Sequence, residues 1–237
     1  MMVNWGGGAE VELMTIVVMF SGGIDSTYLL WQYLLKKEAD IHVHHIGLKN
    51  DKGNRWKSEN RAVSRILDYM RKNVSADFDF STSVLDFTMP YRGIADLNAV
   101  TFMGFHVAES LSGSADPISS DNLPPDIKNR LNKDDVYMAA GYHLDYAGQD
   151  WLACTYPSVK KLESLWNHLK DNSKSLVRDM IYPLKSMTKQ ETVLGLPKEI
   201  RSLTSYCRSP DENYNACGRC HTCKQVEESL KPQKEGT

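Results

Sequence analysis

The chain has 237 residues, of which 41% are hydrophobic and 24% charged, which excludes a wholly disordered protein and allows one substantial core with a small appendage. A formal charge of −2 and a pI near 6.4 argue against a nucleic-acid partner recruited by net charge, although a local basic groove would be hidden in that sum. No apolar run reaches the ~18 residues of a membrane-spanning helix, and no basic region precedes an apolar stretch at the N-terminus, so we expect a cytoplasmic protein without a membrane partner.

Strand-like and helix-like segments alternate along the chain. Residues 1–14 contain three consecutive glycines without a period and are predicted to be a tail outside the fold. Short β-branched and apolar runs at 15–20, 41–48, 78–87 and 136–142 predict strands, and amphipathic segments at 25–37, 59–72, 98–111 and 159–170 predict helices. This alternation predicts an α/β fold with a Rossmann-like, doubly wound parallel sheet over residues 15–199. The polar, proline-containing stretch 113–135 predicts a surface loop, and residues 200–237 form a separate cysteine-bearing segment.

A glycine turn joins the first predicted strand to the first predicted helix. Its sequence, SGGIDST at positions 21–27, lets backbone N–H groups approach an anion in front of the helix N-terminus. Asp25 can cap the helix or hold a Mg²⁺ ion that bridges phosphate oxygens. The predicted phosphate-binding residues are Ser21, Gly22, Gly23, Asp25, Ser26 and Thr27. The turn lacks the Gly-Lys-Ser/Thr of a Walker loop, and an ordinary strand-to-helix turn with a polar cap is the alternative.

Four of the five cysteines lie between positions 207 and 223 with the spacing C-x9-C-x2-C-x2-C. Without a secretion signal, such clustering favours metal thiolates over disulfides. The predicted ligands of one tetrahedral, structural Zn²⁺ ion are Cys207, Cys217, Cys220 and Cys223. A redox CxxC pair and an iron–sulfur cluster are the alternatives. His221, inside the last CxxC, is expected to face solvent, and the lone Cys154 is expected to pack in the core.

The glycine turn and the cysteine cluster together suggest a family. SGGIDST resembles the SGGxDS signature of the PP-loop ATP pyrophosphatases, which split ATP into AMP and pyrophosphate and adenylate a substrate oxygen. With the C-terminal CGRCHTC after Cys207, the chain resembles the 7-cyano-7-deazaguanine synthase (QueC) family. Further stretches match in order: TFMG at 101–104, AGYHLDYAG at 140–148 and PLKSMTKQE at 183–191.

This resemblance implies an ATP-dependent ligase of queuosine biosynthesis that forms carbon–nitrogen bonds. ATP would adenylate the carboxylate of 7-carboxy-7-deazaguanine, ammonia would displace AMP to give the amide, and a second ATP would convert the amide into the nitrile, preQ0. The implied cofactors are ATP, Mg²⁺ for the phosphates and Zn²⁺ for the fold. The resemblance also implies a homodimer.

Three residues outside the glycine turn and the cysteine cluster are candidates for the chemistry. Lys189, in a matching stretch, is the candidate cation that stabilises charge at the α-phosphate. Asp145 and Tyr206 are the candidate substrate contacts, the latter because its ring could stack on a flat heterocycle. Simpler interpretations make Lys189 an exposed lysine near a helix N-terminus, Asp145 the end of a strand and Glu191 a helix-surface acid.

The chain departs from the family in the half that would bind the acid. The family's Y-P-D-C-R is replaced by QDWL at 149–152, the asparagine of its G-x-N is His143, and its Thr-Trp-Ser-Cys is TSYC at 204–207. These changes keep activation by ATP and leave the acid and the attacking nucleophile open. A divergent relative, as found in phage-defence gene clusters, would pass the acid to an amine on a protein or another macromolecule.

Two further hypotheses belong to other classes. A nucleotide-sensing zinc module would bind ATP without turnover. A tRNA-thiolating PP-loop enzyme would need a catalytic thiol pair, and the sequence offers no such pair outside the cysteine cluster.

Overall fold

The computed structural model describes residues 14–49, 53–74, 77–87, 96–112, 135–141, 155–173 and 177–231. Residues 1–13 of the predicted tail, residues 113–134 of the predicted surface loop, Asp145 and Cys154 lie outside these ranges. Within them the α/β fold is confirmed, and strands and helices alternate as the sequence predicts.

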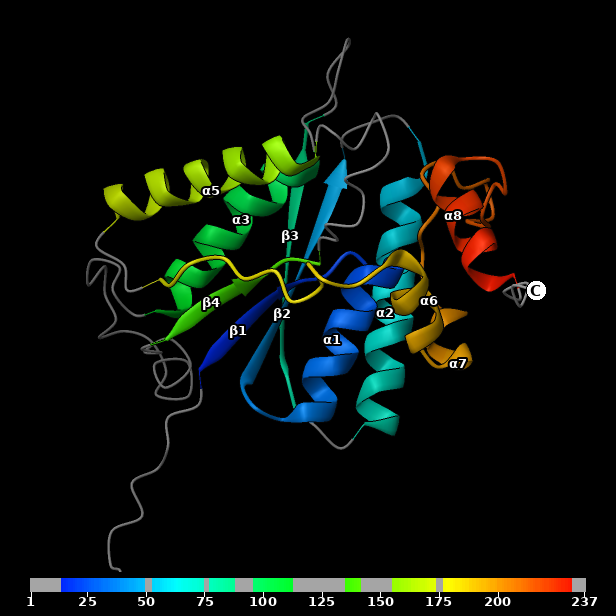
Figure 1. The fold of residues 1–237 in the computed structure, drawn as a ribbon, viewed down its shortest axis with the longest axis horizontal. Helices are drawn as coiled ribbons and strands as arrows, with labels where there is room; N and C mark the ends of the chain where they lie inside the picture. The colour runs from blue at the N-terminus through cyan, green and yellow to red at the C-terminus, as the bar shows by residue number, and fades with distance from the viewer. Residues whose placement is uncertain are drawn as a thin grey trace, which may run out of the picture.

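Four parallel strands form the sheet (Figure 1). They are β1 (Thr15–Met19), β2 (Asp40–Lys49), β3 (Asp79–Asp86) and β4 (Val136–Ala139), in the order β3-β2-β1-β4. Past β4, the Ala140 N–H donates to the Ile181 carbonyl at 3.1 Å, so an extended segment continues the parallel pairing. The chain moves from β1 through β2 to β3 and then returns to the other side of β1, where the strand order reverses.

Among the described residues, two helices cover each face of this sheet (Figure 1). They are α1 (Ile24–Lys36) and α2 (Arg55–Asn73) on one face, and α3 (Asp96–Leu111) and α5 (Thr155–Asn172) on the other. The observed α2 begins at Arg55, before the predicted start at 59. The sequence did not indicate this first turn because Trp56 is its single apolar residue and sets no period. No helix in the described ranges is long and apolar enough to cross a membrane.

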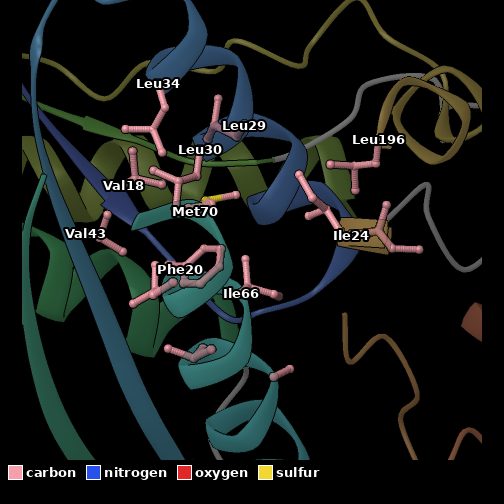
Figure 2. Packing of buried hydrophobic residues seen from close by; sticks show 14 of the residues in the cluster. Val18, Phe20, Ile24, Leu29, Leu30, Leu34, Val43, Ile66, Met70 and Leu196 are labelled. Carbon is pink, nitrogen blue, oxygen red and sulfur yellow. The ribbon is translucent and has the colours of Figure 1, made fainter. Parts of the chain in front are cut away.

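The two faces of β1 explain its continuous apolar sequence. Ile16, Val18 and Phe20 pack against α1 and α2, while Val17 and Met19 pack against α3 and α5. Figure 2 shows the first of these clusters, in which side chains from the sheet meet those of both helices. A strand buried on both sides is apolar at every position, and each large aliphatic side chain buried in this way contributes roughly 1.5–3 kcal/mol.

Three helices that the sequence analysis did not predict follow the sheet. They are α6 (Lys189–Gly195), α7 (Lys198–Arg201) and α8 (His221–Leu230). A capping box begins α6: the Thr188 hydroxyl accepts from the Glu191 N–H at 3.1 Å, and the Glu191 carboxylate accepts from the Thr188 N–H at 2.6 Å. Glu191 therefore caps a helix. Since α8 contacts α6 and α6 contacts α1, the C-terminal segment packs on the core.

Candidate functional site

A cavity of about 450 Å³ lies at the carboxyl ends of β1, β2 and β4. Its walls include Phe20 directly after β1, Ile46 in β2 and Gly141 after β4. Open α/β sheets bind ligands at the carboxyl ends of their strands, where the strand order reverses. The volume lies within the range of small-molecule sites, so this cavity is the candidate active site.

The glycine turn forms one wall of the cavity. Gly22 has a φ of 72°, in the left-handed region, and an added Cβ would lie 3.1 Å from both Cγ2 and the backbone nitrogen of Val63 in α2. Gly23 is the N-cap of α1 with an ordinary φ of −77°, and within the described chain no side chain caps this helix. The N-terminus of α1, which lines the cavity through Gly23, Asp25 and Ser26, favours an anion there.

Two hydroxyl groups brace the turn. The Oγ atoms of Ser21 and Ser26 lie 3.2 Å apart, and the Ser26 hydroxyl donates to the Gly23 carbonyl at 3.3 Å. The Ser21 oxygen accepts from the Gly23 N–H at 3.3 Å. Because hydroxyl groups rotate and can both donate and accept, the same two side chains can hold the turn and bind a phosphate oxygen.

Replacing Gly22 by Ala tests the role of the left-handed turn. We expect the free energy of unfolding to fall by about 1–2 kcal/mol, because an L-residue is strained at this φ and the new methyl group crowds Val63. Chemical denaturation measures the change. Gly47→Ala in β2 is the control, because its added Cβ would make only ordinary contacts, from 3.5 Å outward, and an equal loss of stability in the two variants would contradict the expectation.

Lys189 joins the glycine turn from the far end of the chain. Its Nζ atom lies 2.5 Å from Oδ1 of Asp25, and the Thr192 hydroxyl donates to the same oxygen at 3.3 Å. The lysine is only 8% exposed, and it lines the cavity together with Asp25. A cation held by a carboxylate in this way has a fixed position beside the helix N-terminus.

The structure brings most of the predicted phosphate-binding residues to one wall. Ser21, Gly23, Asp25, Ser26 and Lys189 all line the cavity. Gly22 shapes the turn from behind. Thr27 is fully buried, and its hydroxyl has no hydrogen-bond partner among the described residues, so its side chain belongs to the core side of α1.

Of the two candidate substrate contacts, the structure describes Tyr206 alone. Asp145 lies outside the described residues. Tyr206 is half-buried and lines a second cavity instead. From the C-terminal segment, Arg208, Thr222 and Gln225 line the candidate active site.

Sequence reasoning missed a charged network on the opposite wall. Arg55 donates to Glu59 at 2.9 Å and pairs with Asp96 at 2.6 Å, and Arg208 donates to the same Asp96 carboxylate at 2.8 Å. The network links α2, α3 and the cysteine-bearing segment. Asp96 lies 41 positions from Arg55 and 112 from Arg208, separations that no local pattern reveals. Arg55 and Glu59, one turn apart, have an ordinary helix-surface spacing.

Burial and charge set the ionisation of this network. Burial raises the pKa of Glu59, and the Arg55 guanidinium only partly opposes it. Burial also works against ionisation of Asp96, but Arg55 and Arg208 outweigh it, so the pKa of Asp96 lies below its ordinary value. The wall therefore combines a firmly ionised Asp96 with a more basic Glu59 beside it.

A neutral histidine completes the cavity. His44 in β2 is buried, and its ring nitrogens lie 2.7 Å from the Ser81 hydroxyl and 3.0 Å from the Ser83 hydroxyl. Burial, reinforced by the charges of His42 and His45, lowers the pKa of His44 to about 4. Its imidazole is thus uncharged near neutral pH and presents a polar but neutral surface to a ligand.

The four predicted metal ligands meet in space. The Sγ atoms of Cys207, Cys217, Cys220 and Cys223 all lie within 4.8 Å of one another. A tetrahedral Zn²⁺ with bonds of about 2.3 Å places its sulfurs ~3.8 Å apart. In a four-iron cluster each thiolate binds a different iron and the sulfurs stand further apart, so the observed spacing favours a single ion.

Backbone geometry supports thiolates at this site. N–H groups of Ser209 and Cys217 donate to the Cys207 sulfur at 3.4 and 3.2 Å, and Gly218 turns the chain with a φ of 68°. Backbone N–H groups of Arg219 and Cys220 lower the pKa of Cys217 to about 6. Burial raises the pKa of Cys223, and a bound cation would favour its thiolate form.

Comparisons with known proteins find likeness to solved structures at low sequence identity. No family model and no curated protein matches the sequence. The U34-tRNA thiolase NcsA from Methanococcus maripaludis, solved with its 4Fe-4S cluster, is 18% identical with a TM-score of 0.47; the alignment covers 92% of this chain and 65% of the thiolase. A predicted subunit of a tRNA methyltransferase from Methanocaldococcus jannaschii is 15% identical with a TM-score of 0.33, covering 82% and 76%. The chain spans less than two thirds of the thiolase, and the assignment of the site rests on the chain's own residues.

Proposed function

We propose that this chain is an enzyme that binds ATP in the candidate active site and splits it between the α and β phosphates to activate a carbonyl oxygen of a second substrate. One observation carries the proposal. The pair of buried Lys189 and half-buried Asp25 lies at the glycine turn and the N-terminus of α1, at the carboxyl edge of the sheet. These are the elements needed to hold a phosphate chain and to neutralise charge at the atom under attack.

The residues of this wall have separate roles in phosphate binding, charge stabilisation and orientation. The N–H groups at the start of α1, with the Ser21 and Ser26 hydroxyls, bind phosphate oxygens. Lys189 stabilises the charge that develops at the α-phosphate when the substrate oxygen attacks and pyrophosphate leaves. Asp25 orients the lysine. It is also the only carboxylate from α1 among the described lining residues and would be the ligand for a Mg²⁺ ion, which lowers the charge repulsion within ATP.

The second substrate of the proposal is 7-carboxy-7-deazaguanine. Its carboxylate attacks the α-phosphate, ammonia displaces AMP to form the amide, and a second ATP activates the amide oxygen so that loss of AMP leaves the nitrile. The resemblance of the motifs supports this substrate. So does the opposite wall, where Glu59 and Asp96 can accept from the N–H edge of a guanine-type ring and Arg208 can donate to its carbonyl.

The products of ATP test the reaction class. Incubation with ATP, Mg²⁺, ammonium and 7-carboxy-7-deazaguanine, followed by mass spectrometry, is expected to yield AMP, pyrophosphate, the amide and the nitrile. The glycine turn lacks the lysine that a Walker loop uses for the γ-phosphate, so ADP and phosphate as products would contradict the proposal.

The same assay separates the alternatives. AMP formation that needs the acid but gives no nitrile would indicate a divergent relative that passes the acid to another amine. Bound but uncleaved ATP under all conditions would indicate a nucleotide-sensing module.

A further inference from the structure

A second cavity, of about 460 Å³, lies between α2, α7 and the segment that carries the cysteines. It sits behind the glycine turn: the Ser205 N–H donates to the Gly22 carbonyl at 2.8 Å, and Ser205 lines the second cavity. No residue is shared between the linings of the two cavities. The second cavity is therefore a separate site, and the proposed ATP chemistry does not account for it.

Four cations gather in its lining. Arg61 and Arg65 lie one turn apart on α2, and Lys198 and Arg201 lie at the two ends of α7. None of the described residues that line the cavity is an Asp or a Glu. Like charges brought together raise the energy of the folded state, so such a cluster without acidic residues is suited to an anionic ligand.

None of the four cations has a salt-bridge partner within the described ranges. Arg201 donates to the Val193 carbonyl at 2.7 Å, and Arg61 reaches the Asn213 carbonyl at 3.4 Å. These two are anchored by neutral acceptors, which leaves their positive charge uncompensated. The exposed side chains of Arg65 and Lys198 extend the positive charge to the rim.

Aromatic and hydroxyl groups stand among the cations. Tyr206 and Tyr214 line the cavity, and the Arg61 guanidinium lies 5.9 Å from the centre of the Tyr214 ring. The Ser58 and Ser205 hydroxyls, 2.8 Å apart, lie in the same wall. Cations interleaved with aromatic rings bind nucleotides by pairing with phosphates and stacking on bases.

From this arrangement we infer that the second cavity binds a nucleotide unit, with its phosphate on the four cations and its base against the tyrosines. The overall charge of −2 conceals this local basic site. This inference also explains why Tyr206 lines the second cavity, beside these cations, and does not line the candidate active site. A free nucleotide and a single-stranded RNA offer the same chemistry to this surface.

Fluorescence anisotropy with two probes tests the site: a fluorescein-labelled 12-mer of single-stranded RNA and a fluorescent derivative of AMP. The variant is Arg65→Glu/Lys198→Glu, because both side chains are exposed and no protein contact among the described residues depends on them. We expect it to weaken binding of the recognised probe at least tenfold. If that probe is RNA, the slope of log Kd against log salt concentration should fall by about 1.4, because each of the two lost phosphate contacts contributes ~0.7 to the slope.

Lys160→Glu/Lys161→Glu on α5 is the matched control, with the same change of charge on the opposite face of the sheet. If the test variant loses RNA binding while the control keeps it, the ligand is a single-stranded RNA. If the test variant loses only the binding of the AMP derivative, the ligand is a free nucleotide. Both outcomes support the inference. Absence of binding by both probes, or equal weakening in the two double variants, overturns it. Circular dichroism of each variant confirms that the fold is retained.

Discussion

Replacing Lys189 by Ala is expected to lower the rate of AMP formation about 10²–10³-fold, the usual cost of removing one group that stabilises charge in the transition state. The lysine is buried beside the glycine turn and held by Asp25, so its cation is oriented before ATP arrives. Solvent offers no replacement of equal strength, because water molecules must reorient around the developing charge whereas the lysine is already in place. The rate is measured from AMP production in the assay with ATP, Mg²⁺, ammonium and 7-carboxy-7-deazaguanine.

Two further variants separate loss of charge from loss of structure. Lys185→Ala is the matched control, since this exposed lysine lies in the same segment and does not line the cavity; it should keep the wild-type rate. Lys189→Met retains the aliphatic packing without the cation and should be as slow as Lys189→Ala. A Met variant with the wild-type rate would show that the positive charge plays no part in the reaction.

Local sequence signals predicted the sheet and the glycine turn because each is encoded within a few residues. The run TIVVMF at 15–20, rich in β-branched residues and followed by SGG, is typical of a strand buried on both faces. The cysteine cluster could be predicted for the same reason. Cys217, Cys220 and Cys223 follow one another at intervals of three residues, and a single loop joins Cys207 to them.

What the sequence did not reveal depends on contacts between distant segments. The sequence offered Lys189 as a candidate without indicating a partner. The fold shows that it pairs with Asp25, 164 positions away, at the wall of the cavity. Asp96 meets Arg208 across 112 positions, and nothing near either residue marks the pair. Tyr206 was predicted for the substrate because a motif carries it, yet the backbone turns its side chain toward the second cavity. The short helices α6 and α7 were missed because four to seven residues offer too little periodicity to detect.

Replacing Cys217 by Ser is expected to reduce bound zinc from about one ion per chain to a small fraction of that and to unfold the segment around residues 207–231 locally. Structural zinc sites in isolated peptides bind with roughly 10–16 kcal/mol, a free energy comparable to the whole stability of a domain. Removing one of four thiolates therefore outweighs any single packing contact in this segment. Elemental analysis measures the metal, and hydrogen exchange of residues 207–231 measures the local unfolding.

The local unfolding should disturb the acid-binding side of the active site more directly than the phosphate-binding side, which it reaches only through the contact of α8 with α6. Arg208 follows the ligand Cys207 and pairs with Asp96 on the wall opposite the glycine turn. The Cys217→Ser variant should thus lose affinity for the acid more than for ATP, whose phosphates meet Ser21, Ser26 and Lys189 on the other wall. A KM comparison for the two substrates measures this difference.

His221→Ala is the matched control for the metal. The side chain lies inside the last CxxC but is exposed and is not a member of the four-sulfur cluster, so this variant should keep its zinc and its protection from hydrogen exchange. Zinc-free wild-type protein, visible iron–sulfur absorption, or a Cys217→Ser variant with full metal content and unchanged stability would each contradict a four-thiolate zinc site. Loss of zinc in His221→Ala would instead place the imidazole among the ligands and leave one thiolate available for chemistry, because a tetrahedral ion accepts four ligands.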